Sequence, residues 1–166
     1  MKPFSIKPLN SFQIIVLGFA GVILAGALLL MLPVSSATHC VTPFLSALFT
    51  STTSVCVTGL IVVDTGTYWS VFGQAVILVL IQIGGMGVVT VAAAVTIVSG
   101  RKIGLMQRST MQEAVAAPKM SGIVRLTGFI IRATFLIELS GAALLAPVFC
   151  RDFGPVRGLW MALFHS

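Results

Sequence analysis

The stretch TPFLSALFTSTTSVCVTGL, residues 42–60, decides the fold. Thr42-Pro43 is typical of a helix start, in which a hydroxyl caps the first turn and proline takes the first helical position. The pairs Phe44-Leu45 and Leu48-Phe49 follow with helical spacing, so the sequence predicts a helix over about residues 43–54. A helix of that length measures about 18 Å, roughly half of a bilayer.

The next six residues, 55–60, favour an extended path because Val55, Val57 and Thr58 are β-branched. Gly59 permits a backbone conformation that is closed to other residues. Five or six extended residues return about 17–20 Å, which matches the length of the helix. The sequence therefore predicts a re-entrant loop, in which a pore helix enters the membrane and a filter strand leaves by the same face.

Backbone that is not helical at this depth is tolerated only where protein buries it or where it lines a water-filled path. A strand without a ladder partner has spare carbonyl oxygens, and rings of such oxygens can replace the water shell of a monovalent cation. The carboxyl end of the short helix adds about half a negative charge at the same depth. The alternative that remains open is a hydroxyl-rich helix hairpin over residues 43–60 that only packs against its neighbours.

The composition excludes several classes of protein. Of the 166 residues, 57% are hydrophobic and 8% are charged, whereas a soluble domain usually carries about 25% charged residues. These values argue against a soluble enzyme, a disordered tail and a nucleic-acid binder, and they predict contact with membrane lipid. The sequence contains no enzyme motif and its three cysteines have no metal spacing, so we expect neither catalytic residues nor a cofactor.

Three apolar segments are long enough to cross a bilayer core of about 30 Å. They predict membrane spans over about residues 12–32, 73–99 and 125–149. The first segment exceeds the usual apolar core of a signal peptide, so we expect it to be retained as a span.

Basic residues predict how these spans are oriented. If residues 43–63 enter and leave by the same face, eight basic residues share one side of the membrane and two lie on the other. If that segment crosses fully, the split becomes four against six. The positive-inside rule favours the first arrangement, with the N-terminus and the loop 100–122 in the cytoplasm. The eight residues are Lys2, Lys7, Arg101, Lys102, Arg108, Lys119, Arg125 and Arg132, and the two are Arg151 and Arg157.

Two short motifs recur with the same offset of 115 residues. GALLLMLP at residues 26–33 is matched by GAALLAP at 141–147, and ALFTS at 47–51 is matched by ALFHS at 162–166. Two matches in the same order and register predict an internal repeat of span, pore helix, filter and span.

The repeat divides the chain into one full unit, residues 1–122, and the start of a second, residues 123–166. The pore helix of the second unit is expected at about residues 157–166. One filter strand cannot surround an ion, because a ring needs about four. We therefore expect this chain alone not to conduct, and to be either a fragment of a longer protein or one that must oligomerise.

These stretches resemble the Ktr/Trk/HKT superfamily of potassium uptake proteins, most closely the bacterial Ktr-type membrane subunit. The similarity covers nearly the whole chain, and the stretch around the predicted filter is highly specific. The residues that carry it are TSVCVTGLIVVDTGTYWS at 53–70, GQ at 73–74, LIQIGGMG at 80–87, GRKIGL at 100–105 and LFHS at 163–166.

The resemblance implies an all-α membrane protein built from four covalently linked helix–pore loop–helix repeats. It implies that potassium, the transported ion, is bound by the backbone carbonyls of Cys56, Val57, Thr58 and Gly59, with Gly59 as the filter glycine. It also implies a multi-pass protein of the bacterial plasma membrane, a homodimer of the full-length subunit, and a cytosolic nucleotide-binding regulatory subunit as partner. No metal other than the permeating potassium is expected.

The leading hypothesis is therefore potassium uptake through a carbonyl-lined filter, as part of a four-repeat pore subunit. One alternative is a non-conducting truncated scaffold or assembly subunit, and another is a sodium-permeable cation transporter of the same family. A secondary transporter for a small polar solute would require two halves of opposite orientation, and the direct 115-residue repeat argues against it.

Several residues outside the predicted filter have two interpretations. Gly84, Gly85 and Gly87 favour close packing of the second span against the pore loop over a hinge. Glu138 is an ionisable group within a span, for which we favour structural pairing with an Arg or a buried amide over a functional role.

Three residues follow the filter on its outer side. Asp64 is equally compatible with attracting cations to the entrance and with capping the next turn. Tyr68 and Trp69 are expected to anchor the chain at the outer membrane–water boundary.

Overall fold

The computed structural model describes residues 10–98, 104–114 and 123–166, and every element in these ranges is a helix. The chain forms two compact units, residues 1–123 and residues 124–166. The helices of the first unit are α1 (Ser11–Met31), the 3₁₀ turn η1 (Pro33–Ser35), α2 (Phe44–Val55), α3 (Thr65–Tyr68), α4 (Val71–Met86), α5 (Val88–Val98) and α6 (Leu105–Ala114). The second unit comprises α7 (Ile123–Phe153) and α8 (Pro155–His165).

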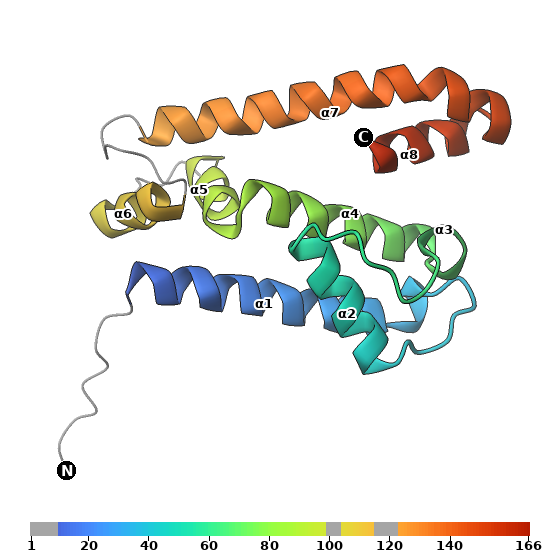
Figure 1. Ribbon diagram of the computed structural model, residues 1–166, viewed down its shortest axis with the longest axis horizontal. Coiled ribbons are helices and arrows are strands. Elements are labelled where there is room, and N and C mark those ends of the chain that lie inside the picture. The colour runs from blue at the N-terminus through green and yellow to red at the C-terminus, as the bar shows by residue number, and fades with distance from the viewer. Residues whose placement is uncertain (1–9, 99–103, 115–122) are drawn as a thin grey trace, which may run out of the picture. The chain divides into compact units, whose positions relative to one another are not determined.

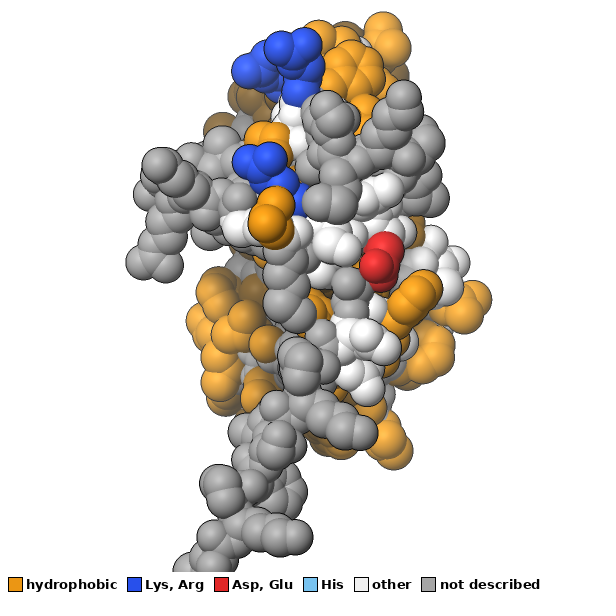
Figure 2. Space-filling model, turned by 90° about the vertical axis from the view of Figure 1, so that its left-hand side faces the viewer, with side chains coloured by type: hydrophobic (Ala, Val, Ile, Leu, Met, Phe, Trp, Pro, Cys, Tyr) orange, Lys and Arg blue, Asp and Glu red, His pale blue; other side chains and the backbone are white. Residues whose placement is uncertain are grey.

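Helix α1 is apolar along its length and leaves many large side chains exposed. Gln13 Oε1 accepts a hydrogen bond from the Asn10 N–H (3.0 Å) and so satisfies one free donor at the helix start. Leu17, Leu24 and Leu28 are exposed, and Figure 2 shows patches of hydrophobic side chains on the surface of the described residues. An apolar helix with an exposed apolar surface is suited to lipid rather than to water.

The short helix α2 crosses between α1 and α4 (Figure 1). A Cβ added at Gly26 of α1 would lie 2.5 Å from Ser51 Oγ and 2.7 Å from Leu80 Cδ1, so the glycine lets three helices meet. The Ser51 hydroxyl is fully buried and donates to the Ile23 carbonyl oxygen of α1 (2.7 Å). This bond compensates for burying the hydroxyl and fixes α2 against α1.

The second predicted span is broken into two helices. Within the predicted span of residues 73–99, α4 ends at Met86 and α5 begins at Val88. Gly87 between them has a φ of +82°, and its N–H donates to the Gly84 carbonyl (3.1 Å). Hydropathy does not register this break, since the residues on both sides of Gly87 are apolar.

The turn from α3 to α4 is held by a buried tryptophan. Trp69 is 2% exposed, so the expectation that it anchors the chain at the membrane boundary is wrong. The residue pairs with Ser36 in an isolated β-bridge, and its ring packs edge-on against Tyr68 with centroids 5.0 Å apart. Gly73 completes the packing, because a Cβ there would lie 3.1 Å from Trp69 Cε3 and overlap the Ser35 carbonyl oxygen.

In the second unit, α8 folds back along α7. Gly154 turns the chain with a φ of +79°, and a Cβ at Gly158 would lie 2.5 Å from the Cys150 Cα. Helix α7 continues through Pro147 to Phe153, beyond the end predicted at 149, and α8 starts at Pro155, before the start predicted at 157.

Among the described residues, two helices are long and apolar enough to cross a membrane by length and composition, Phe12–Met31 and Val124–Phe153. Two more apolar helices, Phe44–Val55 and Val71–Met86, are too short to be counted with them. The basic residues of the predicted cytoplasmic loop are only partly covered, because 99–103 and 115–122 lie outside the described residues, as does the N-terminal segment 1–9.

Candidate ion-binding loop

The loop of interest begins at the carboxyl end of α2, where the helix closes with two reversed hydrogen bonds. The Thr58 N–H donates to the Thr53 carbonyl (3.0 Å), and the Val57 N–H donates to the Ser54 carbonyl (3.3 Å). These bonds form a Schellman motif, in which the residue after the C-cap adopts a left-handed conformation. Cys56 is the C-cap, and Val57 therefore takes the position that glycine usually fills.

Val57 is an unusual residue in that position. Its φ is +52°, and a β-branched side chain at positive φ is a true outlier. Such strain costs about 1–3 kcal/mol and tends to gather at functional sites. The valine side chain is 56% exposed, so burial of apolar surface does not explain the conformation.

The extended strand predicted over residues 55–60 is not formed. Val55 is the last residue of α2, Cys56 is near the right-handed helical region with a φ of −82° and a ψ of −3°, and Gly59 is left-handed with a φ of +72°. The β-propensity of the valines is overridden by the helix-ending bonds from Val57 and Thr58. A Cβ at Gly59 would meet no atom within 4 Å, so crowding does not require a glycine there. The positive φ does favour glycine, because other residues rarely adopt it.

The carbonyl oxygens of this loop are free. Within the described part of the chain, no donor bonds to the carbonyl oxygens of Cys56, Val57, Thr58 and Gly59. All four residues are exposed, so these oxygens do not belong to a packed protein interior. The carboxyl end of α2 points at the same place and adds its partial negative charge.

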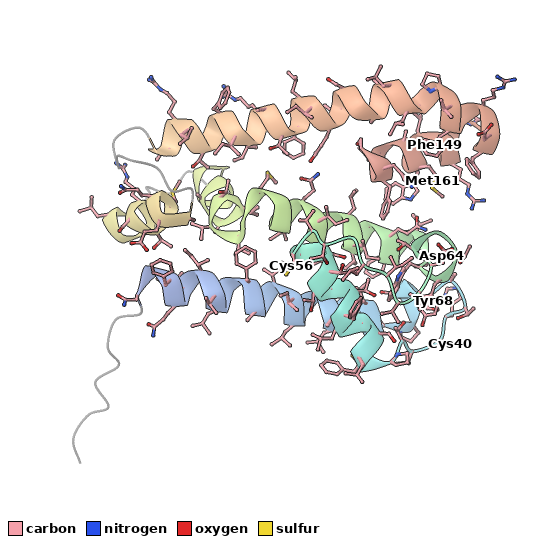
Figure 3. All side chains as sticks on the ribbon, viewed as in Figure 1. Cys40, Cys56, Asp64, Tyr68, Phe149 and Met161 are labelled. Carbon is pink, nitrogen blue, oxygen red and sulfur yellow. The ribbon has the colours of Figure 1, made fainter. Side chains whose placement is uncertain are left out.

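The loop lies deep along α4 rather than at its end. A Cβ at Gly84 would overlap the Val55 carbonyl oxygen and lie 2.7 Å from the Val55 carbonyl carbon. Gly84 is the fourteenth residue of α4, so the contact is about 20 Å from the first residue of that helix. Figure 3 agrees, because Cys56 lies beside the middle of the α1 and α4 helices whereas Asp64, Tyr68 and Cys40 gather at one end of them.

The glycines expected to pack against the pore loop behave differently from one another. Gly84 packs against the end of α2, as predicted, while Gly85 faces open space. Gly87 is the point at which the helix breaks, which corresponds to the hinge alternative rather than to packing.

The start of α2 also differs from its prediction. The N-cap is Pro43 rather than Thr42, and the Pro43 carbonyl accepts from the Ala47 N–H (3.0 Å). Thr42 is fully buried, and its hydroxyl accepts from the Tyr68 hydroxyl (3.3 Å). The bond to Tyr68 takes the hydroxyl away from the helix end, so Thr42 ties the residues before α2 to the end of α3.

Asp64 stands at the outer end of the loop and is exposed. The Thr67 hydroxyl donates to Asp64 Oδ2 (2.5 Å), and this bond holds the pKa of the carboxyl below its ordinary value of 3.8. Asp64 also stands at the N-cap position of α3, and the bond from the Thr67 hydroxyl ties it to the turn that follows.

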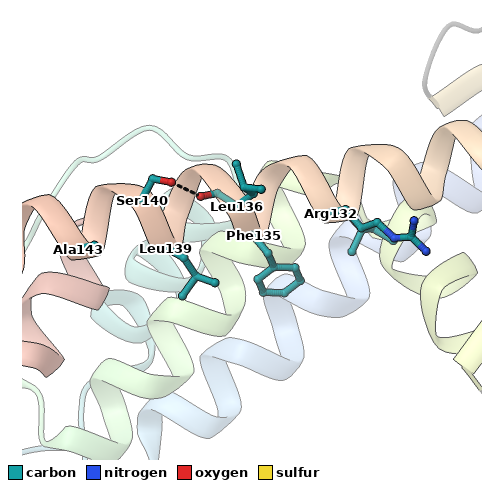
Figure 4. A pocket seen from close by; sticks show the side chains of 7 residues that line it. Arg132, Phe135, Leu136, Leu139, Ser140 and Ala143 are labelled. Atoms are coloured by element: carbon teal, nitrogen blue, oxygen red, sulfur yellow. Dashed lines mark hydrogen bonds between the residues drawn. The ribbon is translucent and has the colours of Figure 1, made fainter.

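The described residues form an apolar hollow in each unit. One of about 470 Å³ lies between α1 and α4 beside Gly26, Phe72 and Leu80. The other, of about 550 Å³, follows the surface of α7, where Ser140 donates to the Leu136 carbonyl (2.7 Å) and Arg132 is the one charged lining residue (Figure 4). Neither hollow gathers the polar groups that hold a small ligand. Among the described residues, no group of three His, Cys, Asp or Glu side chains could hold a metal ion.

The second unit repeats one contact of the first. Ser51 lies against Gly26 of α1, and Ser166 lies against Gly141 of α7, where a Cβ would be 3.2 Å from the serine Cβ. The two glycines are 115 residues apart in the sequence, and so are the two serines. Glu138 lies half-buried in α7, three residues before Gly141.

Two residues at this site were missed by sequence reasoning, Ser51 and Thr53. Thr53 Oγ1 accepts from the Leu60 N–H (2.9 Å) and pairs with Thr58 Oγ1 (2.6 Å). Hydroxyls are common in this helix, so composition alone cannot distinguish these two from the rest. The useful signal is position, because Thr53 precedes the left-handed residue by one helical turn.

The chain matches the TrkH family, described as a cation transport protein, over residues 5–166. It is 37% identical over its whole length to the potassium/sodium uptake protein NtpJ of Enterococcus hirae, of which it covers 37%. It is 42% identical over 93% of its length to the Ktr system potassium uptake protein B of Bacillus subtilis, of which it covers 34%. It is 32% identical over 97% of its length to the Ktr system potassium uptake protein D of the same organism, of which it covers 36%.

The chain thus spans about a third of the length of the relatives that it matches. The family is one of transporters, which points away from an enzyme, and together with the two long apolar helices it points to a membrane protein. By a match that covers nearly all of its residues, this chain belongs to the TrkH family of cation transport proteins.

Proposed function

We propose that this chain contributes one pore loop to a potassium uptake protein, and that potassium is bound by the backbone carbonyls of Cys56, Val57, Thr58 and Gly59. The observation that carries the proposal is a loop at the carboxyl end of a half-length helix, whose carbonyls accept no hydrogen bond from the described residues. Carbonyl oxygens without hydrogen-bond donors can replace the hydration shell of a monovalent cation.

The backbone conformation supports this assignment. In a β-strand, successive carbonyls point to opposite sides, so only alternate oxygens face one path. Val57 and Gly59 have φ values of +52° and +72° and are outside the β-strand conformation, so this alternation is interrupted at both residues. Holding Val57 at positive φ costs local stability, and backbone strain of this kind is concentrated at binding sites.

The internal repeat supports a pore built from several such loops. The pair Gly26 and Ser51 and the pair Gly141 and Ser166 make the same contact at the same separation. A left-handed residue precedes the short helix in each unit, His39 in the first and Gly154 in the second, and these two are also 115 residues apart. Four repeats in the complete protein would enclose one ion path.

The remaining expectations concern the whole assembly. The N-terminus and the loop 100–122 are proposed to be cytoplasmic, in a multi-pass protein of the bacterial plasma membrane. A homodimer and a separate cytosolic regulatory subunit are proposed as partners, the latter because relatives are named as components of a Ktr system.

A sodium-permeable transporter is a second candidate. It is favoured by one observation, the name of the relative NtpJ, which is described as a potassium/sodium uptake protein. The two candidates share the site and differ only in how strictly it selects.

The proposal is tested by Gly59→Ser in the complete protein that carries this sequence. A side chain at φ +72° costs about 1–2 kcal/mol, and there is no clash to add because the space around Gly59 is open. Serine disfavours this conformation and should displace the carbonyls, so the ratio of potassium to sodium uptake should fall; a loss of 1.4 kcal/mol in the binding of potassium relative to sodium lowers it about tenfold. Uptake of both ions is measured in cells that lack other potassium transporters.

Gly85→Ser is the matched control, because Gly85 is helical and also has open space around it. Its uptake ratio should equal that of the unmodified protein. An unchanged ratio in Gly59→Ser, with protein present in the membrane, would remove the loop from the selective path.

A further inference from the structure

The hydroxyl of Thr53 is the side-chain group that joins the pore helix to the far side of the loop. Its oxygen accepts from the Leu60 N–H (2.9 Å) and lies 2.6 Å from Thr58 Oγ1, while the Thr53 carbonyl accepts from the Thr58 N–H (3.0 Å). We propose that Thr53 is a positioning residue for ion selectivity, which holds the loop on both sides of Gly59. This inference rests on the proposed function of the loop.

The need for such a residue follows from the exposure of the loop. Residues 56–60 are all exposed, so apolar packing does not fix their backbone. Gly59 itself has no heavy atom within 4 Å of a Cβ position and is the most permissive residue of the chain segment. Fixing Thr58 and Leu60 to one oxygen leaves Gly59 with little freedom, because its two neighbours are both attached.

The two bonds suit a single threonine hydroxyl. One lone pair accepts from the Leu60 N–H, and the hydroxyl proton or the second lone pair serves Thr58 Oγ1. A valine side chain has the same branched shape but can neither donate nor accept a hydrogen bond. Thr53→Val therefore removes both bonds with little change in volume, whereas Thr53→Ser keeps the hydroxyl.

The neighbouring residue provides a matched control. Thr52 is in the same last turn and is partly buried like Thr53, but its hydroxyl donates back to the Leu48 carbonyl of its own helix (2.7 Å). Thr52→Val removes one helix-internal bond and none to the loop. Any general effect of losing a threonine hydroxyl at the end of α2 should appear equally in both variants.

The experiment compares Thr53→Val, Thr53→Ser, Thr52→Val and Thr58→Val in the complete protein. Membrane content and the uptake of potassium and of sodium are measured for each variant. Thr53→Val should lower the ratio of potassium to sodium uptake by about three- to tenfold, which is the range expected for the loss of one to two net hydrogen bonds. Thr53→Ser should restore most of the ratio, and Thr52→Val should leave it unchanged.

The double variant Thr53→Val with Thr58→Val tests the pairing itself. If the two hydroxyls act through one contact, the double variant should be no worse than the more severe single variant. Additive losses would overturn the proposal. So would a loss of potassium and sodium uptake in equal proportion, or an equal change of the ratio in Thr52→Val, because these describe a helix that is merely less stable.

Gly59→Ser in the same assay separates the two levels of the proposal. If Gly59→Ser lowers the ratio and Thr53→Val does not, the positioning role of Thr53 fails while the pore loop stands. If neither changes the ratio although uptake persists, the assignment of the loop to the selective path fails first.

Discussion

At the scale of single residues, Val57 combines a β-branched side chain with a φ of +52° at the end of α2. Helix ends of this kind usually place glycine there, which meets no steric penalty. The strain is maintained because two backbone bonds close the helix around it and the Thr53 hydroxyl fixes the residues beyond. We interpret the valine as a residue that restricts the loop to one conformation at the expense of local stability.

Replacing this valine tests that interpretation. Val57→Gly should leave the free energy of unfolding unchanged or raise it by up to about 1 kcal/mol, because relief of strain outweighs the added freedom of the unfolded chain. Thermal unfolding of the purified complete protein measures the effect. Val41→Gly, at an exposed loop residue without positive φ, should instead lower stability by about 0.4–1 kcal/mol. A clear loss of stability in Val57→Gly would show that the valine side chain is needed for packing.

Asp64 is a second residue whose role can be tested, because its carboxyl group is charged over a defined pH range. The Thr67 hydroxyl lowers the pKa of the carboxyl below 3.8, so the group is ionised throughout pH 5–8. A lowered folded-state pKa stabilises the folded form above the unfolded value and loses that contribution as pH falls through the folded value. The difference in melting temperature between the unmodified protein and Asp64→Asn should thus be constant from pH 5 to 8 and shrink only below about pH 4. Convergence of the two already at pH 6 would mean that the pKa is raised.

At the scale of elements, the position of α2 depends on glycines in the helices beside it. Gly84 of α4 lies against the Val55 backbone, and the next residue, Gly85, faces open space. Gly84→Ala should destabilise the protein by about 1–3 kcal/mol, because the new methyl group overlaps backbone that cannot move aside. Gly85→Ala should be neutral or stabilising by up to about 1 kcal/mol, since alanine is the better helix former.

Urea or thermal unfolding of the two variants measures this contrast, and uptake selectivity should change only in Gly84→Ala, because Val55 leads directly into the loop. Equal effects of the two substitutions would mean that α4 does not support the end of α2.

The elements also show what the sequence could and could not predict. The short helix was predictable because its apolar residues have helical spacing and its length is set by proline before it and β-branched residues after it. The path after Val55 was not predictable from propensity, because a helix-ending motif overrode the preference of Val57 for an extended backbone. The same limit applies to Gly87, whose break in an apolar run leaves hydropathy unchanged, and to Trp69, whose burial depends on contacts with the distant η1 turn.

The sequence identified the residues of the candidate site but not the backbone conformation of the loop. Cys56, Val57, Thr58 and Gly59 were singled out as carbonyl donors, and this assignment remains a prediction. The structure adds that their carbonyls are free within the described residues and that two of the four residues are left-handed. Contacts between distant residues, such as the bond from Leu60 to Thr53, depend on the loop geometry and carry no local sequence signal.

At the scale of the whole molecule, the chain forms two compact units that share one kind of contact. The matching glycine–serine contacts, Gly26 with Ser51 and Gly141 with Ser166, link the sequence repeat to a repeat in structure. The relatives are about three times as long as this chain, which leaves room for further units of the same kind. An ion path enclosed by several loops would then be a property of the complete protein.

The central claim is that main-chain oxygens rather than charged side chains hold the permeating ion. It is tested most directly by a crystal structure of the complete protein grown in rubidium, whose anomalous scattering marks the ion. The account predicts an anomalous peak beside the carbonyl oxygens of residues 56–59, with no carboxylate in contact. A peak beside Asp64 or Glu138, with none at the loop, would contradict it.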